Sequence, residues 1–368
     1  MKRISLKLVL IMTFLMLSSC NETVVTNIVH PDGSVTRRIE IKDQDKKSFQ
    51  KENFRVPFDE SWTISDTFEV SFHGDTVRGD TTWIRKAEKL FKNVSEINKE
   101  YENDKGSNRD FVREARFSKK FRWFNTLYTF SENIEKSFIY GYPVGQYLSG
   151  RELEYFYMPE NILNERKKGP DSAMVKQIED TLNSKKDHWF LMCCISEWRE
   201  EFLRLAQKKG LKDITSESLM NKDPEIVNML EKSIETYANA DPKDSVEFQY
   251  DSVFRNIVKT ALGDDFPGKY ETEIDTTLNI LMNRFNKHDQ FQSYSVKTIM
   301  PGSMVATNGF IDQNGEILWS VKSDFFLTQN YQMWAESKTS NTWAWIVSGI
   351  FLVFVLSGLV FRIIMRRN

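Results

Sequence analysis

The sequence contains few side chains whose type and spacing would support catalysis or metal binding. Four histidines stand far apart along the chain, and none has the spacing that a zinc site requires: His30, His73, His188 and His288. The chain has no Gly-x-Ser-x-Gly elbow, His-Glu-x-x-His helix, Walker loop or dinucleotide-binding fingerprint. We therefore predict no catalytic residue, no metal site and no cofactor, and the pattern favours a non-enzymatic role.

Two weaker clusters have simpler structural explanations. His188 with Cys193 and Cys194 offers soft-metal ligands, but residues five and six apart on a helix point in different directions. Buried, unpaired thiols are the favoured interpretation, because adjacent cysteines in a helix cannot close a disulfide. The pair Asp264-Asp265 offers carboxylates to a cation, although a helix end followed by a polar loop explains it equally well.

The one cysteine in a position suited to chemistry is Cys20. A basic start and an apolar run over 8–17 lead into Leu17-Ser18-Ser19-Cys20, which resembles a bacterial lipobox. In such a motif two small residues fit the peptidase, and the thiol of the cysteine receives diacylglycerol. We predict a lipoprotein signal peptide over 1–19 and lipidation of Cys20; the alternative is an ordinary signal peptide with an incidental cysteine.

The C-terminal region predicts a transmembrane helix over 343–363. Residues 343–361 carry no charge and span about 28 Å as a helix, close to the hydrocarbon thickness. Trp343 and Trp345 lie at the expected interface, and three arginines follow the apolar run. By the positive-inside rule the tail, 364–368, is cytoplasmic. The alternative is a buried core helix.

Composition and charge narrow the class of protein. The formal net charge of the 368 residues is −2, which argues against a nucleic-acid partner. The basic residues of the two ends mask a more acidic body, whose net charge is −8 without them. A bacterial inner-membrane protein with a periplasmic body fits best. A eukaryotic type I membrane protein with a glycosylated Asn93-Val94-Ser95 is less favoured, because the ectodomain lacks separated cysteines.

The body predicts strands at both ends and helices between them. The expected strands lie over 23–29, 35–41, 62–72, 83–84, 117–130, 294–299, 304–311, 317–321 and 331–335. The expected helices lie over 87–101 and within 134–291, where 171–209 is predicted to form two helices broken near residue 183. The charged stretch 98–110 is predicted to be an exposed connection.

The segment 117–130 has aromatic residues on both alternating faces, which predicts a central strand covered on both sides. Its aromatic run, Phe121 to Phe130, either lines an apolar cavity or packs in the core. The predicted fold class is α+β. One antiparallel β-sheet domain is formed by 20–132 and 291–338, with a helical insertion over 133–290 and one C-terminal transmembrane helix.

Three short stretches carry a family resemblance: the N-terminal hairpin, the aromatic segment 121–128, and Met300-Pro301-Gly302 continuing to Asn308-Gly309 and Trp319. With them the chain resembles uncharacterised membrane-anchored lipoproteins of Bacteroidota. It is more distantly similar to LppM-type lipoproteins of actinobacteria. The resemblance implies a β-rich envelope domain that binds lipid, and it implies no catalytic residues.

The expected function is that of a doubly membrane-anchored periplasmic protein that binds a hydrophobic ligand, namely membrane lipid, or an envelope protein partner. The alternatives are an envelope hydrolase of unknown substrate and a structural subunit of a membrane complex. A closed apolar cavity would favour ligand binding, and two close carboxylates in a cleft would favour the hydrolase. An apolar patch on the insertion would favour the subunit.

Overall fold

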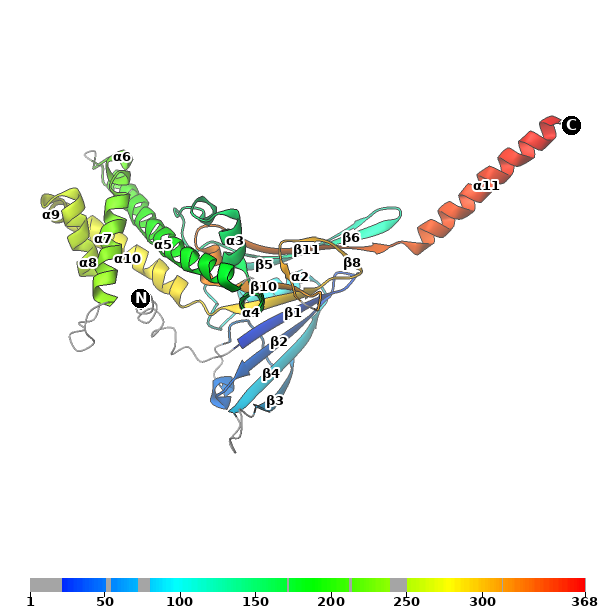
Figure 1. The fold of residues 1–368 in the computed structure, drawn as a ribbon, viewed down its shortest axis with the longest axis horizontal. Helices are drawn as coiled ribbons and strands as arrows, with labels where there is room; N and C mark the ends of the chain where they lie inside the picture. The colour runs from blue at the N-terminus through cyan, green and yellow to red at the C-terminus, as the bar shows by residue number, and fades with distance from the viewer. Residues whose placement is uncertain are drawn as a thin grey trace.

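The computed structural model describes residues 22–50, 54–71, 80–170, 172–211, 214–238, 250–312 and 314–367. The predicted signal peptide, Cys20 and His73 lie outside the described residues. Within them the chain is α+β: two β-sheets adjoin a group of helices, and one long apolar helix projects from the opposite end of the molecule (Figure 1).

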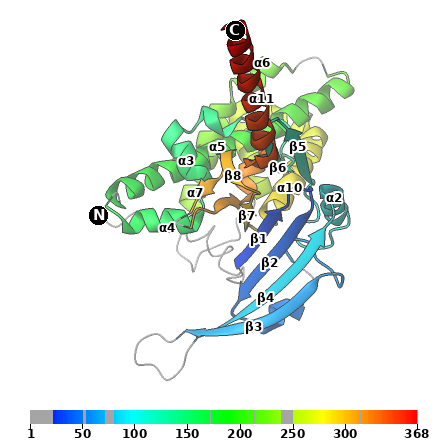
Figure 2. The ribbon, with the colours of Figure 1, turned by 90° about the vertical axis from the view of Figure 1, so that its right-hand side faces the viewer.

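The strands form a seven-stranded and a four-stranded sheet. The larger sheet, in the order β3-β4-β2-β1-β7-β10-β9, consists of β1 (Glu22–Val29), β2 (Val35–Asp43), β3 (Thr63–Ser71), β4 (Asp80–Phe91), β7 (Tyr294–Ile299), β9 (Phe310–Ile311) and β10 (Ile317–Val321). The smaller sheet, in the order β5-β6-β11-β8, consists of β5 (Arg113–Phe121), β6 (Asn125–Ile134), β8 (Ser303–Thr307) and β11 (Tyr331–Ser340). Figure 2 shows β1, β2, β4 and β3 side by side.

The prediction of one antiparallel sheet was wrong in two respects. There are two sheets, and the larger one is mixed, because β1 pairs with β7 in parallel. Parallel neighbours need a long connection, and the chain between these two strands supplies it. The prediction that strands from both sides of the helical segment pair with each other is confirmed, since β1 pairs with β7 and β6 pairs with β11.

The N-terminal hairpin follows its sequence pattern closely. Val29 pairs with Val35 across a tight turn, in which Gly33 adopts a φ of 93° that only glycine accepts readily. Alternate residues of β1 and β2 are buried, so one face of this hairpin lies on the core.

The aromatic segment forms a hairpin instead of the predicted single covered strand. β5 ends at Phe121 and β6 begins at Asn125, and the backbones of Arg122 and Asn125 exchange hydrogen bonds of 2.8 and 3.2 Å. The turn breaks the alternation that the prediction extended through it. Phe121 and the turn residues are consequently exposed, whereas Tyr128 on β6 is buried.

Two predictions between β4 and β5 also need correction. The expected helix over 87–101 is strand β4 as far as Phe91 and then helix α2 (Val94–Glu102), whose N-cap Asn93 accepts a hydrogen bond from the Ser95 amide. The stretch 98–110 is not simply an exposed connection. Asn108 is fully buried, and Asp104 forms a buried ion pair with Arg113.

The segment between the two groups of strands is helical, as predicted. Its helices are α3 (Gly150–Tyr157), α4 (Glu160–Lys168), α5 (Ser172–Lys208), α6 (Ser216–Met220), α7 (Asp223–Ala238), α8 (Tyr250–Leu262), α9 (Asp265–Lys269) and α10 (Glu271–Asp289). Short 3-10 turns lie over Lys46–Gln50, Val144–Gln146 and Ser323–Phe326. The predicted break near residue 183 is wrong. α5 continues for 37 residues, because Asn183 and Ser184 lie within a helix that packs against α3, α4, α7 and α10.

The buried residues of sheets and helices form one continuous hydrophobic cluster. Phe156 of α3 packs edge-on against Trp189 of α5 and against Phe325, which precedes β11. The division into a β domain and a helical insertion stays a prediction. Because the two parts share this cluster, removing one of them would expose apolar residues of the other.

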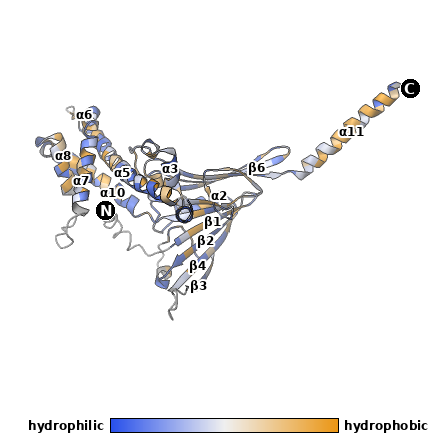
Figure 3. Ribbon diagram, viewed as in Figure 1, coloured by the Kyte–Doolittle hydropathy of each residue, from blue (hydrophilic) through white to orange (hydrophobic). Residues whose placement is uncertain are grey.

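Helix α11 (Thr342–Arg367) follows β11 after the single residue Asn341. In the described part of the chain, it is the one helix long and apolar enough to cross a membrane, with a mean hydropathy of 2.5. Residues 349–366 are exposed, and the helix is largely apolar along its length (Figure 3).

Candidate functional site

The cysteine–histidine cluster of α5 is not arranged as a metal site. Nδ1 of His188 lies 2.9 Å from a carboxylate oxygen of Glu231, and the Cys193 thiol lies 3.6 Å from the carbonyl oxygen of Tyr142. Burial raises the pKa of Cys193 to about 12, so the thiol stays protonated. No group of three or more histidine, cysteine or acidic residues in the described ranges is placed to hold a metal ion.

Two buried carboxylates of α5 serve as structural links instead of an acid–base pair. Glu197 accepts the backbone N–H of Tyr140 at 2.7 Å and pairs with Arg284 of α10. Burial alone would raise the pKa of Glu201, but hydrogen bonds from Arg204 and Arg284 outweigh it and lower that pKa. Both carboxylates are therefore engaged by cationic or backbone donors and hold α10 and the β6–α3 connection to α5. Asp264, the other carboxylate considered above, is highly exposed near Lys259 at the end of α8.

A second buried network joins the two sheets. The guanidinium of Arg37 on β2 pairs with Glu132 on β6, and it donates to Asn27 at 2.9 Å and to the Tyr101 hydroxyl at 2.7 Å. Tyr101 in turn donates to Glu132 at 3.0 Å. These side chains are almost fully buried, so the network connects β1, β2, β6 and α2 and offers no open site to a ligand.

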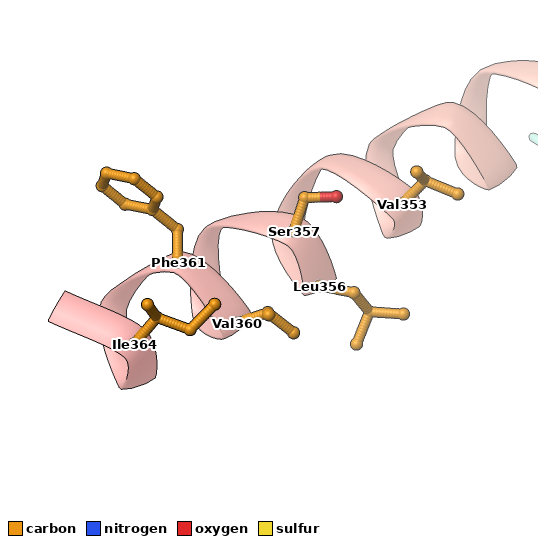
Figure 4. Close-up of a pocket in the computed structure, with 6 residues that line it drawn as sticks. All are labelled: Val353, Leu356, Ser357, Val360, Phe361 and Ile364. Carbon is orange, nitrogen blue, oxygen red and sulfur yellow. The ribbon is translucent and has the colours of Figure 1, made fainter. Parts of the chain in front are cut away.

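The two best-formed hollows in the described structure are not closed apolar cavities. One, of about 480 Å³, is an open groove between side chains of α11 alone (Figure 4), lined by Val353, Leu356, Ser357, Val360, Phe361 and Ile364. The other, of about 400 Å³, is open and lies between β4 and α2; all but one of its lining residues are charged or polar: Asp59, Lys89, Phe91, Glu96, Lys99, Glu100 and Asn103. Neither encloses a lipid-sized ligand behind the β5–β6 hairpin.

The most distinctive surface lies where the β5–β6 hairpin meets the start of α11. Five exposed aromatic residues, which we call the aromatic cluster, come together there: Phe121, Trp123, Phe124, Trp343 and Trp345. Ring centroids are 6.2 Å apart for the stacked pair Phe121–Trp343 and 5.2 Å apart for the edge-on pair Trp123–Trp343. Phe124 and Trp345 lie closer, at 4.3 Å. The ring contacts form two groups, Phe121 and Trp123 around Trp343 and Phe124 against Trp345, and each group joins the hairpin to α11.

Polar contacts fasten the hairpin tip to α11. The Asn341 side chain donates to the backbone carbonyls of Arg122 at 2.7 Å and Trp123 at 3.2 Å, and it accepts from the Thr126 hydroxyl at 3.0 Å. The Asn341 amide donates to the carbonyl of Phe124 at 3.0 Å. The Trp123 indole N–H reaches Ser348, two turns into α11, at 2.9 Å. The hairpin therefore fixes the direction in which the helix leaves the body.

Several strand ends converge near the aromatic cluster. Lys119 on β5 donates to the carbonyl of Pro31, in the β1–β2 turn, at 2.9 Å. Gly302, after β7, lies against the backbone of Lys338 near the end of β11. Glu22 stands at the opposite end of β1, seven residues before Val29. Strand β1 therefore runs from the far end of the body toward the base of α11 (Figure 1).

Sequence reasoning identified Trp343 and Trp345 as interfacial residues but missed their partners on the hairpin. Phe121, Trp123 and Phe124 were assigned to a covered strand, although they lie at an exposed turn. The available signal was Asn125, a residue common in turns, directly after the two consecutive aromatics. No protein-family model, curated protein or solved structure matches the chain.

Proposed function

We propose that the protein is a non-enzymatic, membrane-anchored envelope protein whose β-sheet body contacts membrane lipid through the aromatic cluster. In this proposal α11 spans the inner membrane, the body is periplasmic and the C-terminus is cytoplasmic. The observation that carries the proposal is the set of exposed rings whose contacts join the hairpin tip to the candidate span.

The physical argument rests on how aromatic side chains partition. Tryptophan is enriched at membrane–water interfaces, because its ring is apolar and its indole N–H is polar. A contiguous group of exposed rings is unfavourable in water and marks a contact surface. Phe121, Trp123 and Phe124 contact Trp343 and Trp345, which stand at the start of the apolar helix, so a bilayer that covers the first turn of α11 also reaches the hairpin tip.

The hydrophobic ligand is then the surrounding bilayer and not a molecule held in a closed cavity. The side chains of β6 that face inward, such as Tyr128 and Phe130, already pack in the core. The open groove on α11 has the apolar lining expected of a surface that lies against acyl chains (Figure 4).

A second anchor at Cys20 would constrain the orientation of the body. Eight residues of β1 at about 3.3 Å each separate Glu22 from the end near α11 by roughly 25 Å. Two further residues reach at most about 7 Å. Both anchors therefore enter one bilayer only if β1 is tilted toward its surface. Loss of fatty-acid labelling in Cys20→Ala, with the protein retained in the membrane by α11, is the expected result.

The proposal is tested by photo-crosslinking in membranes that carry diazirine-labelled acyl chains. We expect cross-links on the peptide that contains Phe121 to Phe124 as well as on α11. The double variant Trp123→Ser/Phe124→Ser should lose the hairpin cross-links and keep those of α11, which serve as the internal control. Cross-links on α11 alone in the unmodified protein would contradict lipid contact by the body.

The partner-binding alternative has its own observation. Strand β3 lies at the edge of the larger sheet, and Ile64, Phe68 and Val70 on one of its faces are exposed. An unprotected edge with apolar side chains can accept a strand from another protein. If that is its role, Phe68→Lys should abolish capture of an envelope protein by cross-linking in intact cells and leave the lipid cross-links unchanged.

A further inference from the structure

We infer that cations around the aromatic cluster bind the headgroups of anionic phospholipids. We call these residues the basic ring: Lys119, Lys120, Arg122 and Lys338 are all exposed. The inference rests on the proposed function and deepens it, because it names the class of lipid that the body contacts.

The register of the smaller sheet brings the basic ring together. Lys120 pairs with Leu127 on β6, and Leu127 pairs with Lys338 on β11, so the two lysines flank one apolar residue on the same face. Arg122 occupies the hairpin turn, and its carbonyl accepts the hydrogen bond from Asn341. Charges that are far apart in sequence therefore surround the base of α11.

These cations differ from other basic residues of the sheets in having no acidic partner. Lys120, Arg122 and Lys338 form no ion pair with any residue that the structure describes, and the Lys119 ammonium donates only to a backbone carbonyl. Further along the same strand, Arg116 pairs with Glu114 at 2.7 Å. The basic residues without an acidic partner therefore lie at the end of the smaller sheet that is next to α11.

The distance of the basic ring from the start of the apolar helix is compatible with a position in the layer of lipid headgroups. Trp343 and Trp345 mark the start of the apolar span, and each headgroup layer is several ångströms thick. Lys338 precedes Asn341 by three strand residues, or about 10 Å, and a lysine side chain can extend along the sheet to the layer. Cations beside exposed rings complement a lipid that has an anionic headgroup and apolar acyl chains. A soluble anion would contact the cations but not the rings.

Two acids at this end of the sheets do not pair with the basic ring. Asp32, in the β1–β2 turn, accepts hydrogen bonds from the Ser34 hydroxyl at 2.7 Å and the Ser34 amide at 3.0 Å, so its carboxylate is engaged within its own turn. Glu336 lies two residues before Lys338 on the same face of β11, and among the described residues it forms no ion pair with the basic ring, so the four cations outnumber these two acids.

The test uses the full chain reconstituted in phosphatidylcholine vesicles. Spin-labelled phosphatidylglycerol or spin-labelled phosphatidylcholine is added, and electron paramagnetic resonance gives the ratio of their association with the protein. We expect a preference for phosphatidylglycerol. Replacing the four residues of the basic ring by glutamine should reduce the preference about twofold or more at low ionic strength, and high salt should reduce it in the unmodified protein.

The cytoplasmic arginines Arg362, Arg366 and Arg367 also attract anionic lipid, so they stay unchanged in every variant. The matched control replaces three exposed lysines of the helical insertion by glutamine: Lys168, Lys176 and Lys208. Its lipid preference should equal that of the unmodified protein. The pair Lys120→Glu/Lys338→Glu provides a second variant, with the same change in net charge and a comparable expected loss, if the fourfold replacement lowers the thermal stability.

An unchanged preference in the basic-ring variants, with the acyl-chain cross-links on the hairpin retained, would overturn this inference and leave the proposed function standing. Stronger displacement of phosphatidylglycerol by inorganic phosphate than by sodium chloride of the same ionic strength would also overturn it, because the ligand would then be a soluble anion. Absence of hairpin cross-links in the unmodified protein would instead overturn the proposed function.

Discussion

The two ends of the molecule use the same residue types in opposite ways. In the helical insertion, Trp189 and Trp198 are each 1% exposed and Glu197 is paired with Arg284. At the base of α11, Trp343 and Trp345 are 49% and 57% exposed, and Arg122 has no acidic partner in the described structure. Aromatic residues and charges satisfied within the chain stabilise the fold, whereas those left open indicate contact with something outside the chain.

The largest effect that we predict is the loss of cooperative unfolding when the helical segment is removed from the sheets. Replacing residues 134–289 with a short Gly/Ser linker should abolish cooperative unfolding. The replacement removes Phe156 and Trp189, which pack in the same cluster as Phe325 beside β11. Circular dichroism of the shortened chain during heating measures this. A cooperative melt with a strand-type spectrum would show that the sheets fold without the insertion.

A smaller but substantial effect is expected from the buried charges of the insertion. Glu197→Ala removes the acceptor for the Ile139 and Tyr140 amides and one of the two buried carboxylates that pair with Arg284, the other being Glu201. The loss should lower the free energy of unfolding by about 2–4 kcal/mol. The exposed pair provides the control: Glu114→Ala on β5 should change the free energy of unfolding far less, because solvent screens this ion pair. Chemical denaturation compares the two variants, and equal losses would contradict the assignment of Glu197 as a structural link.

At the base of α11, we expect a local effect. Asn341→Ala removes three side-chain hydrogen bonds that fasten the hairpin tip and should cost about 1–2 kcal/mol. Amide hydrogen exchange should accelerate over residues 121–126 and stay unchanged in α5. The neighbouring Ser340→Ala serves as the control. Unchanged exchange at the hairpin in Asn341→Ala would mean that ring stacking alone holds the tip.

The smallest predicted effect depends on pH. Hydrogen bonds from the Lys185 ammonium and from Ser149 lower the pKa of Glu152 to about 2. A carboxyl whose folded-state pKa is depressed contributes stability above its unfolded-state pKa, about 4.3, and loses that contribution as the pH falls toward 2. The stability difference between the unmodified protein and Glu152→Gln should therefore shrink from pH 6 to pH 2. Glu165→Gln, at an exposed site on α4, should show no such trend.

The sequence predicted local elements better than their assembly. The bounds of β7 and β10 follow directly from β-rich runs, the first ending before the Pro301-Gly302 turn and the second beginning after the Asn314-Gly315 turn. The division into two sheets could not be predicted, because sequence patterns indicate which face of a strand is buried but not which strand lies beside it. The continuous helix α5 and the strand end at Phe91 show tertiary packing overriding local periodicity.

The candidate site was predictable only on its helical side. The apolar run with flanking tryptophans and arginines predicts the helix α11 and the position of Trp343 and Trp345 at its start from composition alone. The hairpin half depends on where the chain reverses, and no glycine or proline marks the turn at Arg122 to Asn125. A shift from strand to turn converts Trp123 and Phe124 from expected core residues to exposed ones.

The most direct test of the central claim measures how deeply the hairpin tip enters the bilayer. An environment-sensitive fluorescent amino acid is placed at position 124 on the tip or at position 220 on α6, where Met220 is also exposed. The full chain is reconstituted in vesicles that contain lipids with nitroxides at known acyl depths. We predict strong quenching at position 124 by shallow nitroxides and no quenching at position 220. Equal, water-like behaviour at both positions would contradict membrane contact by the body.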